Sequence, residues 1–368
     1  MFRSENRLIG LDLGSSAVKI ACVRSGARGW DLMAAGQGRL PEGVIDETGV
    51  NDPDIVSHAI QEALGAAGLR RVRRVVVGVP SRYLTVRVLT VPTMDHSELR
   101  EAAKWEASQY IPYPVEEGVF DFLELGPGAA TGTLDVLSIS ARKTVIDSIV
   151  KAAELAGLEP VALDAAPLAS GRALLAGAAG AAAAAPGLKQ AAATHDGPVG
   201  EEAVALVDIG YSSSDVSIFR GQQLRVARSI PIGGARFTAA VAEALGIDPD
   251  AAEARKQSEV RLDVEEPPLI RLGKPTADQA AYQVAEELAD ELQRSLDYFR
   301  AQSRWMPTHR LVLTGGGSHL QGMDAFLAER LNIEVVRGES VLAGLDTRLA
   351  AGISPVALGL ALWEVTVA

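Results

Sequence analysis

The first apolar run of the chain leads into a small polar turn and then a second apolar run. Residues 7–24 read RLIGLDLGSSAVKIACVR, so apolar positions flank a Gly-Ser sequence. This pattern predicts a β-hairpin with polar groups at its tip. Residues 203–220, AVALVDIGYSSSDVSIFR, repeat the same order of apolar strand, Asp, Gly, Ser cluster and strand. The repeat predicts two similar domains.

Strand and helix patterns alternate between the two repeats. A helical stretch near Asp54 to Ala67 precedes the near-continuous apolar run RRVVVGVP at 73–80, which is typical of a strand buried on both faces. Residues 81–159 then combine an alternating strand, a helix, a strand pair and a helix ending at Gly157. The alternation favours an α/β fold in which 81–159 is an inserted subdomain.

The helix expected from Ser97 to Tyr110 has one small apolar stripe. Trp105 lies off that stripe, so it needs a second surface to pack on. The stripe is formed by Leu99, Ala102, Ala103, Ala107 and Tyr110.

The second half carries a long amphipathic helix and a glycine turn. Apolar residues recur at helical spacing over 278–302, and residues 310–331 read as a strand, a triple-Gly turn and a helix. The last apolar segment, SPVALGLALWEV, predicts a buried closing helix. Gly171 to Glu202 is low in complexity and marks a boundary between the halves.

These patterns divide the chain into two domains with insertions. We expect the domains to follow these boundaries: 1–80 with 160–180 as the first domain, 81–159 as its inserted subdomain, 181–202 as a linker, 203–235 with 306–368 as the second domain, and 236–305 as the subdomain of the second.

Composition excludes several classes of function. The 368 residues are 48% hydrophobic and 22% charged, enough for two cored domains. A net charge of -12 argues against nucleic acid as a partner. No run reaches about 20 strongly apolar residues and the start lacks a secretory h-region, so neither membrane insertion nor export is expected. The single cysteine, Cys22, reads as a core residue in a reducing compartment.

Each hairpin carries the residue types that bind a triphosphate with Mg²⁺. Backbone N–H groups of a glycine turn and small hydroxyl groups approach phosphate closely, and carboxylates suit the Mg²⁺ shell. In the first hairpin, Lys19 adds a positive charge. The expected phosphate contacts are Gly14, Ser15, Ser16 and Lys19 in the first hairpin and Gly210, Ser212, Ser213 and Ser214 in the second, with Asp12 and Asp208 as the metal carboxylates.

A third element is the glycine turn at Gly315, Gly316 and Gly317. Bare backbone there allows a base or ribose to lie close, and a helix N-terminus would point towards phosphate. Either a Gly-Ser turn or a triple Gly alone is more often purely structural. The order and spacing of all three is more specific, and the chain contains neither GxxxxGK[ST] nor a GxGxxG after its first strand.

With these motifs the chain resembles the actin-like ATPase superfamily over nearly its whole length, and within it the FtsA and PilM families. WEASQYIPYPVEE at 105–117, LSISARKTVID at 137–147, SIPIGGARFT at 229–238 and ELQRSLDYFR at 291–300 are similar to the PilM family in particular. The resemblance implies two ribonuclease H-like domains that close on ATP or ADP with Mg²⁺. FtsA proteins also carry a basic C-terminal membrane helix, which the end of this sequence does not resemble.

The resemblance also implies candidate residues beyond the turns. Gly234, Asp290 and Arg294 become candidate nucleotide contacts, although a polar helix face such as that of the last two is more often only solvated. Asp164 is the nearest carboxylate to the place where chaperone-like relatives carry a catalytic acid. Weak or absent ATP hydrolysis is therefore expected.

PilM proteins bind the cytoplasmic N-terminal tail of the membrane protein PilN, so the resemblance implies a PilN-type partner and a place at the inner face of the membrane. Candidate partner contacts are Trp105, Tyr110, Ile111 and Tyr113, which are equally compatible with core packing. The resemblance also implies contacts with other pilus components and is compatible with a homo-oligomer. Alternatives are an FtsA-like division filament, a type II secretion-like role and a small-molecule kinase of the same superfamily.

Overall fold

The computed structural model describes residues 8–26, 29–176, 203–262, 275–303, 306–342 and 353–363. The chain forms two compact units. The first unit holds the described residues of 1–195, 222–228 and 342–368, and the second unit those of 196–221 and 229–341. The linker expected at 181–202 lies outside the described residues.

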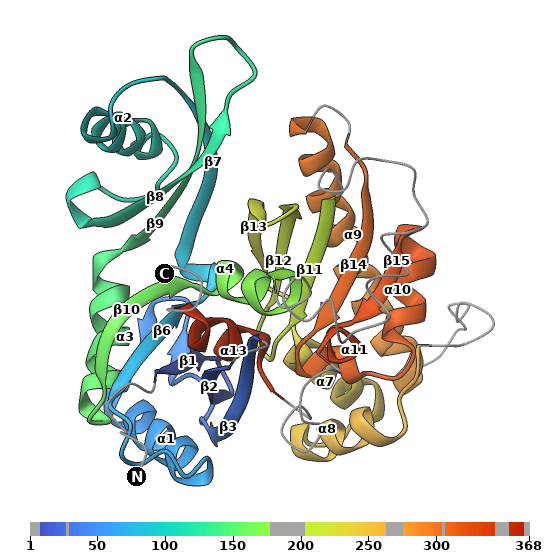
Figure 1. Ribbon diagram of the computed structural model, residues 1–368. Coiled ribbons are helices and arrows are strands. Elements are labelled where there is room, and N and C mark those ends of the chain that lie inside the picture. The colour runs from blue at the N-terminus through green and yellow to red at the C-terminus, as the bar shows by residue number, and fades with distance from the viewer. Residues whose placement is uncertain are drawn as a thin grey trace. The chain divides into compact units, whose positions relative to one another are not determined.

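The first unit is built on a five-stranded sheet in the order β10-β6-β1-β2-β3 (Figure 1). Strands β1, β2 and β3 form an antiparallel meander, and β6 and β10 run parallel to β1. The strands are β1 (Ile9–Leu13), β2 (Ala17–Gly26), β3 (Gly29–Arg39), β6 (Arg74–Val79) and β10 (Glu159–Ala165), with a short pair β4 (Ile45–Asp46) and β5 (Gly49–Val50) beside them.

Helices cover both faces of this sheet. On one face lie α1 (Pro53–Ala66) and α3 (Lys143–Leu155), and on the other lie α4 (Ala166–Gly171) and α13 (Pro355–Ala361). A π-helical turn, Arg172–Ala176, continues α4. Strand β6 alternates its valines between the two cores, which confirms the prediction of a strand buried on both faces.

The closing helix α13 was expected in the second domain but belongs to the first unit. It packs on β1 and α4 of the first unit, as the dark red helix over the blue strands shows in Figure 1. The approach is close: a Cβ added to Gly10 would meet Ala357 O at 2.0 Å, and one added to Gly359 would meet Ala169 O at 1.7 Å. Glycine at both positions lets backbone lie directly on backbone.

Within the insertion expected at 81–159, a three-stranded antiparallel sheet forms in the order β7-β9-β8, with one helix on it. The expected end at 159 is corrected, because α3 packs into the core of the first sheet instead. The elements of the inserted subdomain are β7 (Leu84–Pro92), α2 (His96–Ser108), β8 (Gly118–Pro127) and β9 (Thr133–Arg142), with 3-10 turns at Ser81–Tyr83 and Val115–Glu117. Leu99 and Ala103 of α2 pack on Val91 and Val136 of the sheet. Trp105 is off this stripe, as predicted, and its side chain is 66% exposed.

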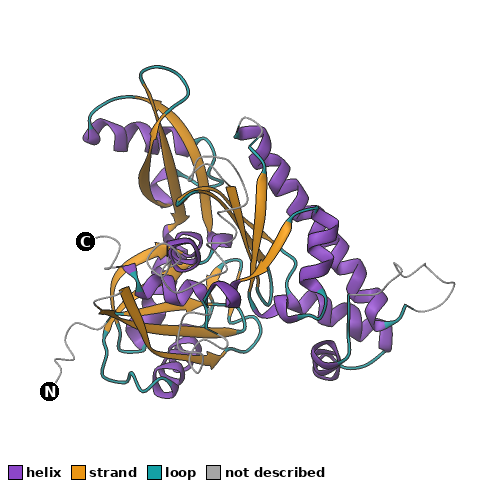
Figure 2. Cartoon of the chain, turned by 45° about the vertical axis from the view of Figure 1, so that its right-hand side comes forward, coloured by secondary structure: helices purple, strands orange, loops and turns teal. Residues whose placement is uncertain are grey.

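A second sheet, in the order β13-β12-β11-β14-β15 and flanked by helices (Figure 2), belongs to the second unit except for most of β13, since residues 222–228 group with the first unit. Strands β11 and β12 form the second hairpin, and β14 and β15 continue the sheet in parallel. The elements are β11 (Ala203–Ile209), β12 (Ser214–Arg220), β13 (Gln223–Ile230), α7 (Gly234–Leu245), α8 (Pro249–Ser258), α9 (Ala277–Gln302), β14 (Thr308–Thr314), α10 (Met323–Leu331), β15 (Glu334–Arg337) and α11 (Gly338–Val341).

The long helix α9 forms where its periodicity predicts it. Thr276 caps its N-terminus and exchanges hydrogen bonds with Gln279 in a capping box. Its stripe is buried at Val284, Leu288 and Leu292, so hydrophobic burial rather than helix propensity fixes its place.

Candidate functional site

The first glycine turn joins β1 to β2 as the sequence predicted. Asp12 and Lys19 are cross-strand partners at its base, and the Gly14 N–H donates to Ala17 O at 3.1 Å across the turn. Directly opposed residues share a face of the sheet, so a carboxylate and an ammonium group flank the turn. Ser15 is buried and Ser16 is exposed.

Asp12 also has a partner that the sequence did not predict. Ser354, which precedes α13, donates its hydroxyl to Asp12 Oδ2 at 2.7 Å. The two residues are far apart in the chain, and no local pattern relates them. The hydroxyl lies beside Asp12 because α13 packs on β1.

The second glycine turn has the same backbone geometry. The Gly210 N–H donates to Ser213 O at 2.9 Å, and Asp208 is paired across the strands with Asp215. One expected phosphate contact is used differently: Ser214 is fully buried and donates its hydroxyl to Ile232 O at 2.6 Å. The Ser214 hydroxyl therefore holds the hairpin to the segment at Ile232. Ser212, in contrast, is exposed.

Gly234 lies against this turn at the start of α7. Its N–H donates to Gly210 O at 2.8 Å, and the Ala235 N–H donates to Tyr211 O at 2.9 Å. The first amides of α7 are thus satisfied by the turn itself, which fixes the turn to the helix. The structure brings Gly234 to the predicted phosphate turn, with its N–H already bonded to protein.

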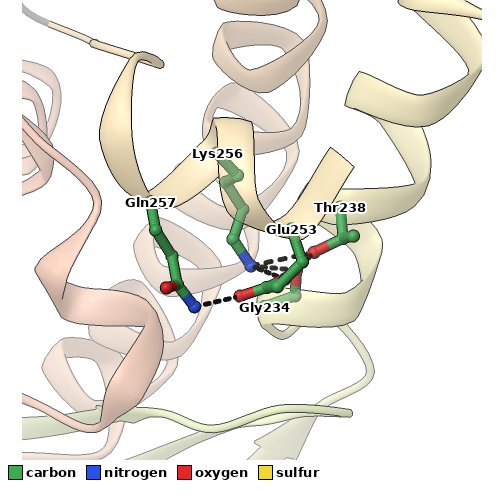
Figure 3. A network of polar contacts seen from close by, with 5 residues as sticks. All are labelled: Gly234, Thr238, Glu253, Lys256 and Gln257. Carbon is green, nitrogen blue, oxygen red and sulfur yellow. Dashed lines mark hydrogen bonds and ion pairs between the residues drawn. The ribbon is translucent and has the colours of Figure 1, made fainter. Parts of the chain in front are cut away.

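A polar network that no sequence motif indicated holds the start of α7 (Figure 3). Lys256 of α8 donates to Gly234 O at 3.1 Å, to Thr238 Oγ1 at 2.8 Å and to Glu253 Oε2 at 2.6 Å. The Thr238 hydroxyl also bonds Glu253, and Gln257 donates to the second oxygen of Glu253. The only sequence signal is a Glu-Lys pair at i,i+3, which is common on helices.

Charge and hydrogen bonding tune Glu253. Burial favours its neutral form, but the hydrogen bonds from Lys256, Thr238 and Gln257 and the charge of Lys256 outweigh burial, so the pKa of Glu253 lies below its ordinary value. The carboxylate therefore stays ionised beside the ammonium group, and the network keeps the start of α7 next to the second turn.

The glycine turn after β14 meets the second hairpin directly. Gly315 has φ of 87°, and an added Cβ would meet Asp208 Oδ1 at 2.2 Å. Gly317 packs on Ile209, whereas a Cβ at Gly316 would meet nothing within 4 Å. The structure thus brings Asp208 and the glycine turn together, and Gly316 is exposed.

The expected helix after this turn begins later than predicted. Residues Gly316–His319 form a 3-10 turn, and α10 begins only at Met323, with Gly322 before it in the left-handed conformation. The N-terminus of α10 is thus separated from the glycine turn. The expectation that this helix points from the turn towards phosphate is corrected accordingly.

Asp290 and Arg294 are not brought to these turns by any contact that the structure shows. Asp290 accepts from Arg330 of α10 at 3.0 Å, and Arg294 donates to Glu291 at 2.7 Å. Both side chains are exposed, so they form surface ion pairs of the kind that contribute little. Their interactions match the solvated-face interpretation.

Asp164 forms a buried ion pair. Arg172 Nη1 donates to Asp164 Oδ2 at 2.9 Å and to Gly359 O of α13 at 2.8 Å. Burial raises the pKa of Asp164, and Arg172 opposes the rise. The carboxylate therefore helps to hold α13, which differs from the catalytic role expected from the sequence.

The candidate partner residues lie in the inserted subdomain and differ in exposure. Trp105 and Tyr110 are exposed, whereas Ile111 and Tyr113 are half-buried. Arg87 stacks over the Tyr110 ring at 5.5 Å and Arg142 over the Tyr113 ring at 5.2 Å. Two further exposed apolar residues, Val119 and Leu123, lie on the neighbouring strand β8, and no pattern in the sequence had indicated them.

The described residues contain neither a membrane-spanning helix nor a cluster of metal-binding side chains. No helix among them is long and apolar enough to cross a membrane. In the same part of the chain, no three His, Cys, Asp or Glu side chains gather as a metal-binding group. The two predicted metal carboxylates accordingly lie in separate hairpins.

Comparison with known proteins gives consistent relationships. The cell division protein FtsA of Bacillus subtilis (strain 168) is 25% identical over 272 residues, which is 68% of this chain and 57% of FtsA. The chain therefore spans little more than half of that relative's length. MreB5 of Spiroplasma citri bound to ADP aligns over 99% of this chain and 98% of its own, with a TM-score of 0.54 at 13% identity, which shows the fold alone.

Two findings establish the family. The solved PilM-PilN type IV pilus biogenesis complex matches with a TM-score of 0.78 and 30% identity, covering 97% of this chain and 98% of that chain. A family model described as type IV pilus assembly protein PilM matches residues 10–338. The two hairpin turns lie within that match. The chain has the actin-like ATPase fold and belongs to the PilM family of type IV pilus assembly proteins.

Proposed function

We propose that this chain is a nucleotide-binding scaffold of the type IV pilus inner-membrane assembly complex, with Mg²⁺-ATP as the ligand of its two glycine turns. The observation that carries the proposal is the repeated turn. In each turn the glycine N–H donates to the carbonyl oxygen three residues later, at 3.1 Å for Gly14 and 2.9 Å for Gly210. An aspartate lies two positions before each glycine.

The residues present fit a magnesium nucleotide. Both turns offer glycine backbone and a serine hydroxyl, and Gly316 of the third glycine turn is exposed. Asp12 and Asp208 would hold the cation, directly or through water, as Mg²⁺ sites in nucleotide proteins commonly do. Bound Mg²⁺ would neutralise phosphate charge, while Lys19 would contribute a second positive charge.

Hydrolysis is expected to be weak or absent. A catalytic base must reach the attacking water, whereas Asp164 pairs with Arg172, which also holds α13. The nucleotide would then act as a conformational ligand, which stabilises whichever state binds it more tightly.

The proposed partner is the cytoplasmic tail of a PilN-type membrane protein. Family membership and the similarity to a PilM-PilN complex support it. Within the inserted subdomain, Trp105 and Tyr110 present exposed aromatic surface, the kind of side chain that often dominates peptide recognition. Such a partner would hold the chain at the inner face of the membrane.

Calorimetric titration tests both proposals on one sample. ATP with and without Mg²⁺ comes first, followed by a synthetic PilN-type tail peptide. The proposal predicts that ATP binds more tightly with Mg²⁺ and that the peptide also binds. Binding of ATP alone would contradict the PilN partner and favour the division-filament or kinase alternatives, which phosphoryl transfer to a panel of small molecules would separate.

A matched pair of variants tests the partner surface. Trp105→Ala removes an exposed aromatic group from the inserted subdomain, so peptide affinity should fall about tenfold or more with little change in melting temperature. Leu245→Ala, which removes an exposed apolar side chain from the second unit, serves as the control. Equal peptide affinity in wild type and Trp105→Ala would remove Trp105 from the partner site.

A further inference from the structure

A single buried hydroxyl joins the end of the chain to the first hairpin. Ser354 is 5% exposed, and its Oγ donates to Asp12 Oδ2 at 2.7 Å. The same oxygen accepts the Ala357 N–H at 3.2 Å, which caps α13. Because the cap uses its lone pair and the aspartate uses its proton, both interactions can form together.

The position of this hydroxyl is fixed by the packing of α13. All seven residues of the helix are buried, and Gly10 and Gly359 bring its backbone against β1 and α4. Further along the helix, Arg172 donates to Gly359 O while it pairs with Asp164. A hydroxyl on so constrained a helix has little freedom to leave Asp12.

We propose that Ser354 is a positioning residue, which orients the Asp12 carboxylate for the cation of a bound magnesium nucleotide and thereby couples cation binding to the docking of α13. The inference rests on the proposed function, because it takes Asp12 as the metal carboxylate. Carboxylates that bind metals are commonly held by hydrogen bonds from neighbouring groups, and loss of such a partner typically weakens metal affinity about 10- to 100-fold.

The coupling must be reciprocal. If the bond from Ser354 to Asp12 strengthens cation binding, then the bound cation must strengthen the attachment of α13 by the same factor. Amide protons of α13 should therefore exchange more slowly with Mg²⁺-ADP than with ADP and a chelator. Lys19, which lies opposite Asp12 in the hairpin, is the same in every sample, so its charge does not contribute to a difference in exchange.

Two substitutions of Ser354 separate its roles. Ser354→Gly removes the donor to Asp12, yet glycine at an N-cap weakens a helix only slightly. Ser354→Thr keeps both the hydroxyl and the cap. Asp52→Gly is the matched control, because it removes the cap of α1 in the same unit, where Asp52 accepts the Asp54 and Ile55 N–H groups.

The test is calorimetric affinity for ADP with and without Mg²⁺, together with hydrogen exchange of α13. Ser354→Gly should lower the Mg²⁺-dependent affinity about tenfold and leave the affinity without Mg²⁺ unchanged, while Ser354→Thr and Asp52→Gly bind as wild type does. If Ser354→Gly keeps the wild-type dependence on Mg²⁺, or loses affinity equally with and without it, the positioning role is overturned.

The wild-type chain provides a readout that needs no variant. Slower exchange in α13 with Mg²⁺-ADP than with ADP and a chelator supports the coupling, and identical exchange overturns it even if Ser354→Gly fails to fold. The proposed function fails separately: wild type would then show no affinity for ADP under either condition. A wild type that binds Mg²⁺-ADP while α13 exchange stays constant overturns the role of Ser354 alone.

Discussion

The two hairpins repeat a backbone but not its charges. Each carries an aspartate two positions before the turn glycine, and each glycine N–H closes the turn at 3.1 or 2.9 Å. In the first hairpin Asp12 faces Lys19, whereas in the second Asp208 faces Asp215. Both hairpins therefore share the backbone turn suited to phosphate. The first places a lysine opposite its aspartate, whereas the second places another aspartate there.

The hairpins also differ in what supports them. The first is backed by α13, which contributes Ser354 and is held by the Asp164 and Arg172 pair. The second is fixed by the start of α7, by the Lys256 network and by Gly315. The two turns share a backbone geometry but are stabilised by different neighbouring elements. Substitutions around the first turn should therefore affect stability differently from substitutions around the second.

The largest effect is expected where the first hairpin depends on α13. Arg172→Met leaves Asp164 buried without its charged partner, which should lower the free energy of unfolding by about 3–5 kcal/mol. Arg24→Met breaks an exposed pair with Asp31 in the same unit and should change it by less than about 1 kcal/mol. Urea denaturation compares them, and equal losses would contradict the assigned role of Arg172.

The next effect distinguishes two neighbouring glycines beside the second hairpin. Gly315→Ala places a Cβ 2.2 Å from Asp208 Oδ1 at a positive φ, so a loss of about 1–3 kcal/mol is expected. Gly316→Ala meets no atom within 4 Å and should stay within about 0.5 kcal/mol of wild type. Thermal unfolding measures both, and a tolerated Gly315→Ala would show that the close approach is not required.

A smaller effect tests the difference in charge directly. Lys19→Met should weaken ATP binding about fivefold, which corresponds to about 1 kcal/mol for a partly exposed charge. Asp215→Asn relieves like charges across the second hairpin and should strengthen ATP binding measured without Mg²⁺. Calorimetry at low and high salt checks both, and salt-independent differences would rule out an electrostatic origin.

The smallest effect concerns pH and the Lys256 network. The folded pKa of Glu253 lies below its ordinary value of 4.5, so its contribution to the free energy of unfolding is present above that value and is lost as pH falls through the folded pKa. Partial exposure limits the contribution to a few tenths of a kcal/mol. Glu253→Gln should flatten acid denaturation in that range, and an unchanged pH profile would contradict the assignment.

Local patterns predicted most of the fold. Paired apolar runs around a Gly-Ser turn predicted the hairpins, and helical spacing predicted α9 with Val284, Leu288 and Leu292 on its buried stripe. Strand β3 was missed because its sequence, GWDLMAAGQGR, is rich in Gly and Ala and carries no β-branched residue. These small residues serve close contact with α1: a Cβ at Gly38 would meet Ala59 O at 2.0 Å.

The candidate site was predictable only in part. Its glycines and aspartates follow a repeated local motif, so their places in the turns could be foreseen. The supporting residues could not, because Ser354 reaches Asp12 through the packing of α13, and Lys256 reaches Gly234 through a neighbouring helix. Asp290, Arg294 and Asp164 were suggested by resemblance, yet each is engaged in an ion pair.

The most direct test of the account is calorimetric titration of ATP, with and without Mg²⁺, into wild type, Asp12→Ala and Asp208→Ala. Mg²⁺ is expected to strengthen ATP binding in wild type, and each variant, still folded by circular dichroism, is expected to lose this gain. Normal Mg²⁺-dependent binding by either folded variant would contradict the assignment of that carboxylate. Absence of ATP binding by wild type would contradict the central claim that these turns bind a magnesium nucleotide.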